Sequence, residues 1–333
     1  MHIPDGYLGP ETLAVGWAAA APVWYAASRK TKAIFSKPKA VPVLAASAAF
    51  SFLVMMLNVP VLGGTTAHAV GATLIAIVAG PWVAVLAVTS ALAIQALLFG
   101  DGGLLSFGIN CVNMAIIMPF AGYAIYQLVG GNSDLRSARR LVGAALGSYF
   151  AIVLASFVVG IELGIQPLLH TVHGIAQYNP YHLGTTIPAM TLSHMAVAGP
   201  VEAVFTVGVL AFLTRTSPEL FNVERRVSAP LRSLYGIIAA LVIATPLGLL
   251  ATGTAYGEWG GDEMLKRVGY IPRGLAKLGE LWKGVLPDYA LNGASGGWTV
   301  FWYVTSAVIG VALLAGLSWL LVRLYRRRAV NSA

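Results

Sequence analysis

The chain has 333 residues, of which 57% are hydrophobic and only 10% are charged. This composition excludes an ordinary soluble globular domain and indicates an integral membrane protein. The formal net charge of +8 is accounted for by basic loops on one side of a membrane, so it predicts no nucleic-acid partner.

The first six residues, Met1-His2-Ile3-Pro4-Asp5-Gly6, form a potential chelator. The free amine of Met1, the His2 backbone nitrogen after deprotonation and the His2 Nδ1 can close two small fused rings around one ion. Such nitrogen ligands suit a square-planar Ni²⁺ or Cu²⁺ ion, with Co²⁺ also possible. Pro4 forbids a helix here and Asp5-Gly6 favours a turn, so the segment is predicted to bend back toward the protein. The alternative is that His2 is a polar residue in a frayed end.

Long apolar runs predict an all-α polytopic membrane protein, because lipid offers no hydrogen-bond partner to an open strand edge. We expect about nine transmembrane helices, with a break between the third and fourth at Gly80-Pro81. Their predicted ranges are 7–28, 41–57, 67–82, 83–98, 105–129, 141–164, 188–214, 233–252 and 299–322.

The basic residues predict the orientation. Sixteen of the twenty-one Lys and Arg residues fall in four clusters, at 29–39, 136–140, 215–232 and 323–328. Nine helices place all four clusters on one side, which is then cytoplasmic. Met1 is expected outside and the C-terminus inside. No cleavable signal peptide is evident, so Met1 is expected to be the first residue.

The connections divide the chain into two blocks. Residues 1–214 form a seven-helix metal-capture block, and the basic cytoplasmic linker 215–232 separates it from a two-helix block at 233–333. The second block contains a polar external segment, near 253–297, which holds ten of the thirty-four charged residues. Within it, acidic residues precede basic ones near 262–268, which predicts a short helix.

An uncharged loop between the second and third predicted helices carries a second histidine. Its sequence ends in Gly63-Gly64-Thr65-Thr66-Ala67-His68, and the predicted topology puts it on the same face as Met1. His68 is therefore a candidate for the fourth nitrogen of a planar site. The alternative is that His68 caps a helix or bonds to a carbonyl group.

These motifs carry a family resemblance. The N-terminal hexad, the His68 loop, Gly100-Asp101-Gly102-Gly103-Leu104 and Asn110-Cys111-Val112-Asn113-Met114-Ala115 resemble the CbiM/NikM family. Its members are the substrate-capture components of energy-coupling-factor transporters for cobalt and nickel. The resemblance implies that Met1 and His2 supply amine, amide and imidazole nitrogens and that His68 supplies the last ligand. It also implies a location in the cell membrane, a transmembrane coupling subunit and a pair of cytoplasmic ATPases.

Residues 233–322 resemble the small N component of the same transporters, chiefly through Pro287-Asp288-Tyr289 and the run from Gly253 to Trp259. A fusion of this kind resembles NikMN proteins, which favours nickel over cobalt. The chain departs from the family pattern at Gly199-Pro200-Val201-Glu202, where Gly-x-Gly-Glu is expected. The proline is expected to kink the seventh helix.

Other polar residues allow more than one role. His170, His173 and His182 lie in an external loop, where they either attract metal, form a second weak site or are ordinary loop residues. Asp101 is expected in a turn or as an acceptor beside a ligand, because a carboxylate ligand favours harder ions. For His194 and Glu202 we favour hydrogen bonds between helices over a role in transport.

The chain has no Gly-x-x-x-x-Gly-Lys-Ser/Thr motif, so we expect a transporter component without its own ATPase and not an enzyme. Ni²⁺ or Co²⁺ is the transported ligand and no cofactor is expected. Metal binding is predicted to weaken at acid pH, because protons compete for the nitrogens. One alternative is a stand-alone secondary divalent-metal permease, although only Glu202 lies clearly at mid-membrane. The other is an intramembrane metalloenzyme, which would need an open ligand position for water.

Overall fold

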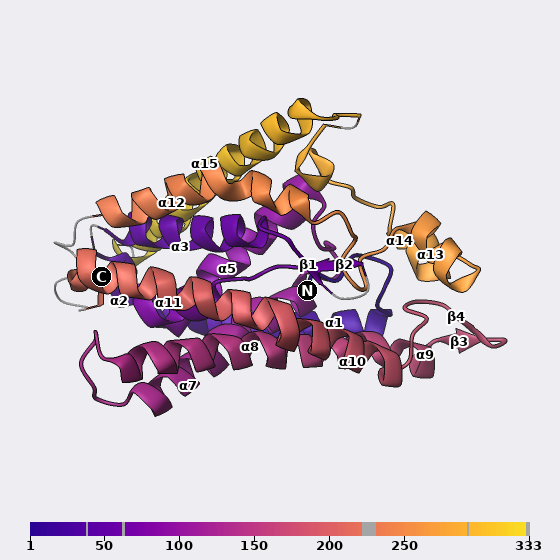
Figure 1. The fold of residues 1–333 in the computed structure, drawn as a ribbon, viewed down its shortest axis with the longest axis horizontal. Helices are drawn as coiled ribbons and strands as arrows, with labels where there is room; N and C mark the ends of the chain where they lie inside the picture. Colours follow the sequence, from indigo (N-terminus) through magenta and orange to yellow (C-terminus); the bar gives the residue numbers. More distant parts are fainter. Residues whose placement is uncertain (38, 62–63, 222–230, 292, 331–333) are drawn as a thin grey trace.

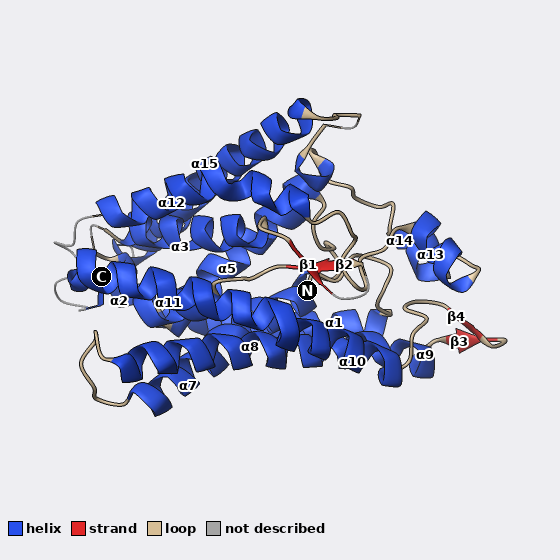
Figure 2. Ribbon diagram, viewed as in Figure 1, coloured by secondary structure: helices blue, strands red, loops and turns tan. Residues whose placement is uncertain are grey.

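The computed structural model describes residues 1–37, 39–61, 64–221, 231–291 and 293–330. Long helices run side by side along much of the molecule, one pair of short strands lies near its middle, and a second pair lies with loops at one end (Figures 1 and 2). In the first 221 residues the helices are α1 Pro10–Lys30, α2 Lys32–Phe35, α3 Ala40–Met55, α4 Ala72–Ala79, α5 Pro81–Ile94, α6 Phe107–Asn110, α7 Met118–Gly130, α8 Ala138–Gly164, α9 Gln166–Leu169, α10 Leu183–Ser193 and α11 Gly199–Thr216. The later helices are α12 Arg232–Ala244, α13 Gly261–Val268, α14 Arg273–Leu278 and α15 Gly297–Val330.

Six helical segments of the described chain are long and apolar enough to cross a membrane. They cover Pro81–Phe99, Phe107–Gly130, Ala138–Leu169, Leu183–Thr216, Arg232–Leu250 and Gly297–Arg326. The predicted helices 7–28 and 41–57 correspond to α1 and to the 16-residue α3. The all-α, membrane-spanning class is therefore confirmed, whereas the number nine is not.

The third predicted span, residues 67–82, is wrong as a single crossing helix. The helix α4 covers only Ala72–Ala79 before the break at Gly80 and the start of α5 at Pro81. Eight residues rise about 12 Å in a helix, against a hydrocarbon thickness of about 30 Å. The preceding residues instead form an antiparallel pair, β1 (Val59–Val61) and β2 (Thr65–Ala67). The break predicted at Gly80-Pro81 is confirmed, because Gly80 has a φ of 96° between α4 and α5.

The described residues include three π-helical turns: η1 (Gln95–Phe99) ends α5, whereas η2 (Cys111–Ile117) and η3 (His194–Ala198) lie within longer helical segments. π-Helical turns are rare and occur often at functional sites. The expected irregularity around Pro200 takes this form, since η3 ends just before Pro200 enters the first turn of α11.

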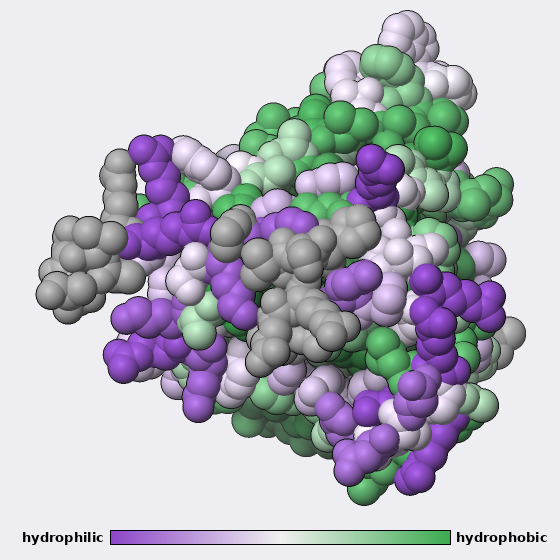
Figure 3. Space-filling view, turned by 90° about the vertical axis from the view of Figure 1, so that its left-hand side faces the viewer, coloured by the Kyte–Doolittle hydropathy of each residue, from purple (hydrophilic) through white to green (hydrophobic). Residues whose placement is uncertain are grey.

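The later helices pack on the first block, because α12 and α15 both run against α3. The predicted short helix near 262–268 is confirmed as α13, and α13 and α14 lie beyond the strands (Figure 1). The basic segments around α2, the α7–α8 turn and the end of α15 lie at the opposite end. Hydrophilic residues spread over that end in Figure 3. Half of the predicted linker 215–232, residues 222–230, lies outside the described residues.

Candidate metal site

The N-terminal hexad lies inside the molecule. Figure 1 shows the first residue in the middle of the fold, beside β1 and β2. Met1 and His2 are each 3% exposed and Ile3 is fully buried. A frayed terminus would be exposed, so that alternative for His2 is wrong.

Hydrogen bonds between the hexad and a distant segment, residues 104–110, hold the hexad in place. Asn110 accepts from the Ile3 nitrogen at 2.9 Å and donates to the Ile3 carbonyl at 3.1 Å. The Asp5 carboxylate accepts from the backbone nitrogens of Leu104, Leu105 and Ser106, each at 3.0 Å. Charge-assisted bonds of this kind are stronger than neutral ones, so Asp5 joins the terminus firmly to the segment leading into α6.

His2 and His68 face each other across a short gap. The His68 Nε2 lies 3.2 Å from the His2 Nδ1, and the ring centroids are 5.0 Å apart. The His68 Nδ1 lies 3.0 Å from the Ala69 carbonyl oxygen, which requires a proton on Nδ1. The Nε2 lone pair therefore points at His2, and a fixed tautomer of this kind is typical of histidines that bind metal.

Glu202 holds the main chain that follows His68. Its carboxylate, fully buried in the first turn of α11, accepts from the nitrogens of Val70 at 2.6 Å and Gly71 at 2.9 Å. Gly71 is the N-cap of α4, so Glu202 makes the expected hydrogen bond between helices, from α11 to the N-terminus of α4. For His194 the expectation is wrong, since its described bond goes to the Met190 carbonyl of its own helix at 2.7 Å.

Asp101 and its neighbouring glycine border the His2 ring. The Asp101 Oδ1 lies 3.1 Å from the His2 Nδ1, which is the acceptor position predicted for it. Gly102 has a φ of +81°, and a Cβ there would lie 3.1 Å from the His2 Cδ2. A larger residue would be strained at this φ and would press on the imidazole.

Burial sets the protonation of this cluster. It lowers the pKa of His2 to about 3, with a further contribution from the nearby terminal ammonium. The pKa of His68 is also lowered well below 6.5, mainly by burial. Both imidazoles are therefore neutral at neutral pH, as metal ligands must be.

The C-terminal block contributes a carboxylate to the same place. The Glu258 Oε1 lies 3.5 Å from the Met1 nitrogen. Burial raises the pKa of Glu258 to about 7, and the ammonium opposes that shift. In addition, the Tyr7 hydroxyl donates to the Trp259 carbonyl at 2.7 Å. This part of the C-terminal block thus packs directly on the N-terminus.

The three loop histidines do not converge. His170 lies 3.0 Å from Glu11 and lines a polar groove with Arg273 and Lys277, whose positive charges disfavour a divalent cation. His173 and His182 are both exposed. Within the described ranges, no group of three or more His, Cys, Asp or Glu residues is arranged to hold a metal.

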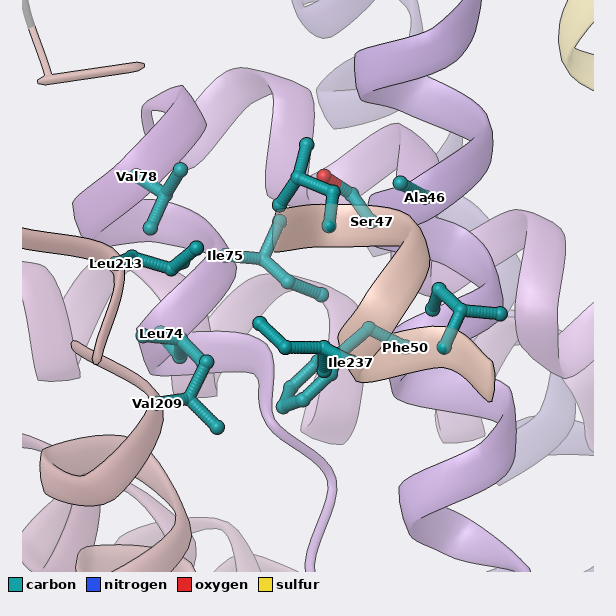
Figure 4. Close-up of a pocket in the computed structure, with 11 residues that line it drawn as sticks. Ala46, Ser47, Phe50, Leu74, Ile75, Val78, Val209, Leu213 and Ile237 are labelled. Atoms are coloured by element: carbon teal, nitrogen blue, oxygen red, sulfur yellow. The ribbon is translucent and has the colours of Figure 1, made fainter. Parts of the chain in front are cut away.

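A separate pocket lies between α3, α4, α11 and α12 (Figure 4). Its lining includes Leu74, Ile75, Val209 and Ile237, and Ser47 is its one polar residue. Apolar side chains offer nothing to a divalent ion. The His2 and His68 region therefore remains the candidate metal site.

Comparison with known protein families identifies two family models that match the chain. The family model for the cobalt uptake substrate-specific transmembrane region, CbiM, matches residues 2–220. The chain belongs to the CbiM family. A PDGLE domain model matches residues 232–327, so this CbiM-family chain is of the fused type and is a multi-pass membrane protein.

Two relatives are similar in sequence to this CbiM-family chain over nearly its whole length. It is 43% identical to the fused nickel transport protein NikMN of Rhodobacter capsulatus, over 98% of this chain and 99% of that protein. It is 44% identical to the probable fused nickel transport protein LarMN of Lactiplantibacillus plantarum, over 95% and 97% of the two chains. A crystal structure of a truncated transition metal transporter is similar at 50% identity and a TM-score of 0.60, covering 65% of this chain and 99% of that one.

Sequence reasoning brought Met1, His2 and His68 together, and the structure places them in one buried cluster. It missed the roles of Asn110 and Glu258. The asparagine was visible as part of a motif, but nothing local showed that its amide would bind Ile3. Glu258 is 257 residues from its partner, and no short-range pattern reports such a contact.

Proposed function

We propose that this protein is the substrate-capture component of an ATP-driven energy-coupling-factor uptake transporter for Ni²⁺ or Co²⁺, with nickel favoured. The ion would bind in a plane of four nitrogens. These are the Met1 amine, the His2 backbone nitrogen, the His2 Nδ1 and the His68 Nε2. The metal is transported cargo and not a resident cofactor.

The observation that carries the proposal is the 3.2 Å separation of the His2 Nδ1 and the His68 Nε2. Nitrogens at adjacent corners of a square, each about 2.0 Å from an ion, lie about 2.8 Å apart. A movement of a few tenths of an ångström would therefore close the plane. Because the described side chains offer no cluster of three ligands, a site here needs the main-chain nitrogens of the first two residues.

Nickel is favoured because four nitrogens in a plane suit Ni²⁺. The two fused relatives are also named as nickel transport proteins. Elemental analysis of protein purified from cells supplied equally with nickel and cobalt tests this choice. An excess of bound cobalt would overturn the nickel preference while leaving the nitrogen site in place.

The proposal assigns the ion to residues 1–214 and an accessory role to 233–333, joined by the basic linker 215–232. We place Met1 and the segment 253–297 outside and the C-terminus inside. The basic segments gather at one end of the molecule (Figure 1), and basic segments favour the cytoplasm. The chain has no phosphate-binding loop motif, so a transmembrane coupling subunit and cytoplasmic ATPases would supply the energy.

Uptake of radioactive nickel by cells tests this dependence. Accumulation should require this chain, the coupling subunit and an intact ATPase together. Full uptake by this chain alone would instead support the stand-alone permease. Finding stoichiometric nickel on the purified protein without uptake activity would locate the failure in the coupling and not in the site.

A further inference from the structure

A chain of hydrogen bonds links the C-terminal block to the second residue. The Tyr289 hydroxyl donates to the Asp101 Oδ2, and the Gln95 amide donates to the same oxygen at 3.3 Å and to the Tyr289 hydroxyl at 2.9 Å. The other oxygen of Asp101 lies 3.1 Å from the His2 Nδ1. Asp101 thus connects Tyr289 to the imidazole, and Gln95 contacts both Tyr289 and Asp101.

The position of Tyr289 is closely fixed. Its ring stacks on Phe99 with centroids 4.6 Å apart, and its carbonyl accepts from the Ser306 hydroxyl at 2.8 Å. Asp288 and Tyr289 have φ values of 52° and 64°. Left-handed conformations at two successive non-glycine residues persist only where the surroundings impose them, so the hydroxyl is presented to Asp101 by a constrained turn.

We propose that Tyr289 is a positioning residue for the metal site. It engages one oxygen of Asp101 together with Gln95, which leaves the other oxygen directed at His2. At Nδ1 the His2 ring contacts both the Asp101 carboxylate and the His68 imidazole, so these contacts help to set its orientation. The Asp101 carboxylate keeps Nδ1 turned toward His68. When an ion replaces the proton on Nδ1, the same carboxylate lies beside the cation and offsets its charge.

This inference rests on the proposed nitrogen site and adds a role for the fused C-terminal block. Partners that orient a metal-binding histidine typically change metal affinity about 10- to 100-fold when they are removed. The C-terminal block would therefore set how firmly the ion is held at a site formed by the other end of the chain.

The test measures Ni²⁺ affinity and release of the ion to a chelator for the full chain in detergent. Tyr289→Phe should weaken affinity about tenfold and speed release, while the visible absorption band of the nickel-saturated protein stays unchanged. Tyr256→Phe is the matched control, because the Tyr256 hydroxyl is buried in the same block with no partner among the described residues. It should bind nickel normally.

A double substitution tests the route through Asp101. If Tyr289 acts through that carboxylate, Tyr289→Phe combined with Asp101→Asn should bind no more weakly than Asp101→Asn alone. Normal affinity and release in Tyr289→Phe would overturn the inference, as would fully additive effects or a lost absorption band. His68→Ala separates the two proposals, because normal binding in that variant would instead overturn the nitrogen site itself.

Discussion

Two groups of histidines differ in their surroundings. His2 and His68 are 3% and 5% exposed, and each has one ring nitrogen directed at the other. His170, His173 and His182 lie together in the sequence, yet two of them are exposed and the third pairs with Glu11. Close spacing along the chain therefore says little about metal binding, whereas burial with converging partners says much.

The comparison has a physical basis. A buried imidazole remains neutral and ready to bind a cation, and its direction is set by neighbours such as the Ala69 carbonyl. An exposed imidazole on a long loop must be ordered before it can bind, at an entropic cost. The buried pair should therefore account for essentially all tight nickel binding.

His68→Ala should have the largest effect. Removing one of four nitrogens leaves the plane open and should abolish nickel retention during purification, a greater loss than the 10- to 100-fold typical of groups outside the ligand set. Elemental analysis of the purified variant measures this. Retention of stoichiometric nickel would contradict the assignment of binding to the buried pair, since the loop histidines would then have to bind the ion.

Acid should weaken nickel binding, and the shape of the pH dependence should distinguish the buried histidine pair from the loop histidines. Chelation releases the protons of the Met1 amine and the His2 amide, so affinity should fall about tenfold per pH unit for each proton released. Because burial lowers the pKa of His2 to about 3 and that of His68 well below 6.5, the imidazoles stay neutral as the pH falls through 6.5. Protonation of the His2 and His68 imidazoles should therefore add no separate step to the pH dependence of nickel affinity near pH 6.5.

Nickel titrations between about pH 8 and about pH 5, on either side of the ordinary histidine pKa, measure this dependence. Constant affinity across that range would contradict a main-chain nitrogen site. A distinct step near the ordinary histidine pKa would instead indicate exposed ligands and favour the loop histidines.

Glu202→Gln should have an intermediate effect. The carboxylate accepts from both Val70 and Gly71, and an amide supplies only one acceptor oxygen, so the chain beside His68 loses part of its support. We expect nickel affinity about tenfold weaker. Glu162→Gln is the matched control, since that buried glutamate accepts from the Asn113 amide at 2.7 Å and a glutamine can do the same. Equal losses in both variants would assign the effect to general destabilisation.

His173→Ala should have the smallest effect. The side chain is exposed at a loop position, so its removal leaves every proposed nitrogen ligand in place. Nickel affinity and retention should match those of the unsubstituted protein. A clear loss of binding would show that the loop takes part in capture.

The sequence was sufficient to predict the membrane class and most helices, because long apolar runs leave few alternatives. Topology made His68 a candidate partner of His2, and the family resemblance implied that the two bind one ion. It failed at residues 67–82, where an apolar run includes a strand and an extended segment that carry His68 inward. Contacts such as Asn110 with Ile3 and Tyr289 with Asp101 were out of reach, because they depend on tertiary packing between distant segments.

The central claim is that the main-chain nitrogens of Met1 and His2 bind the ion. Three alanines added ahead of Met1 test it most directly, because they move the free amine well away from His2 while every side chain is kept; a single added residue would make His2 the third residue and create a new four-nitrogen chelator. Nickel affinity should be lost in the extended chain, with the unextended protein measured in parallel. Affinity equal to that of the unextended protein would contradict the account.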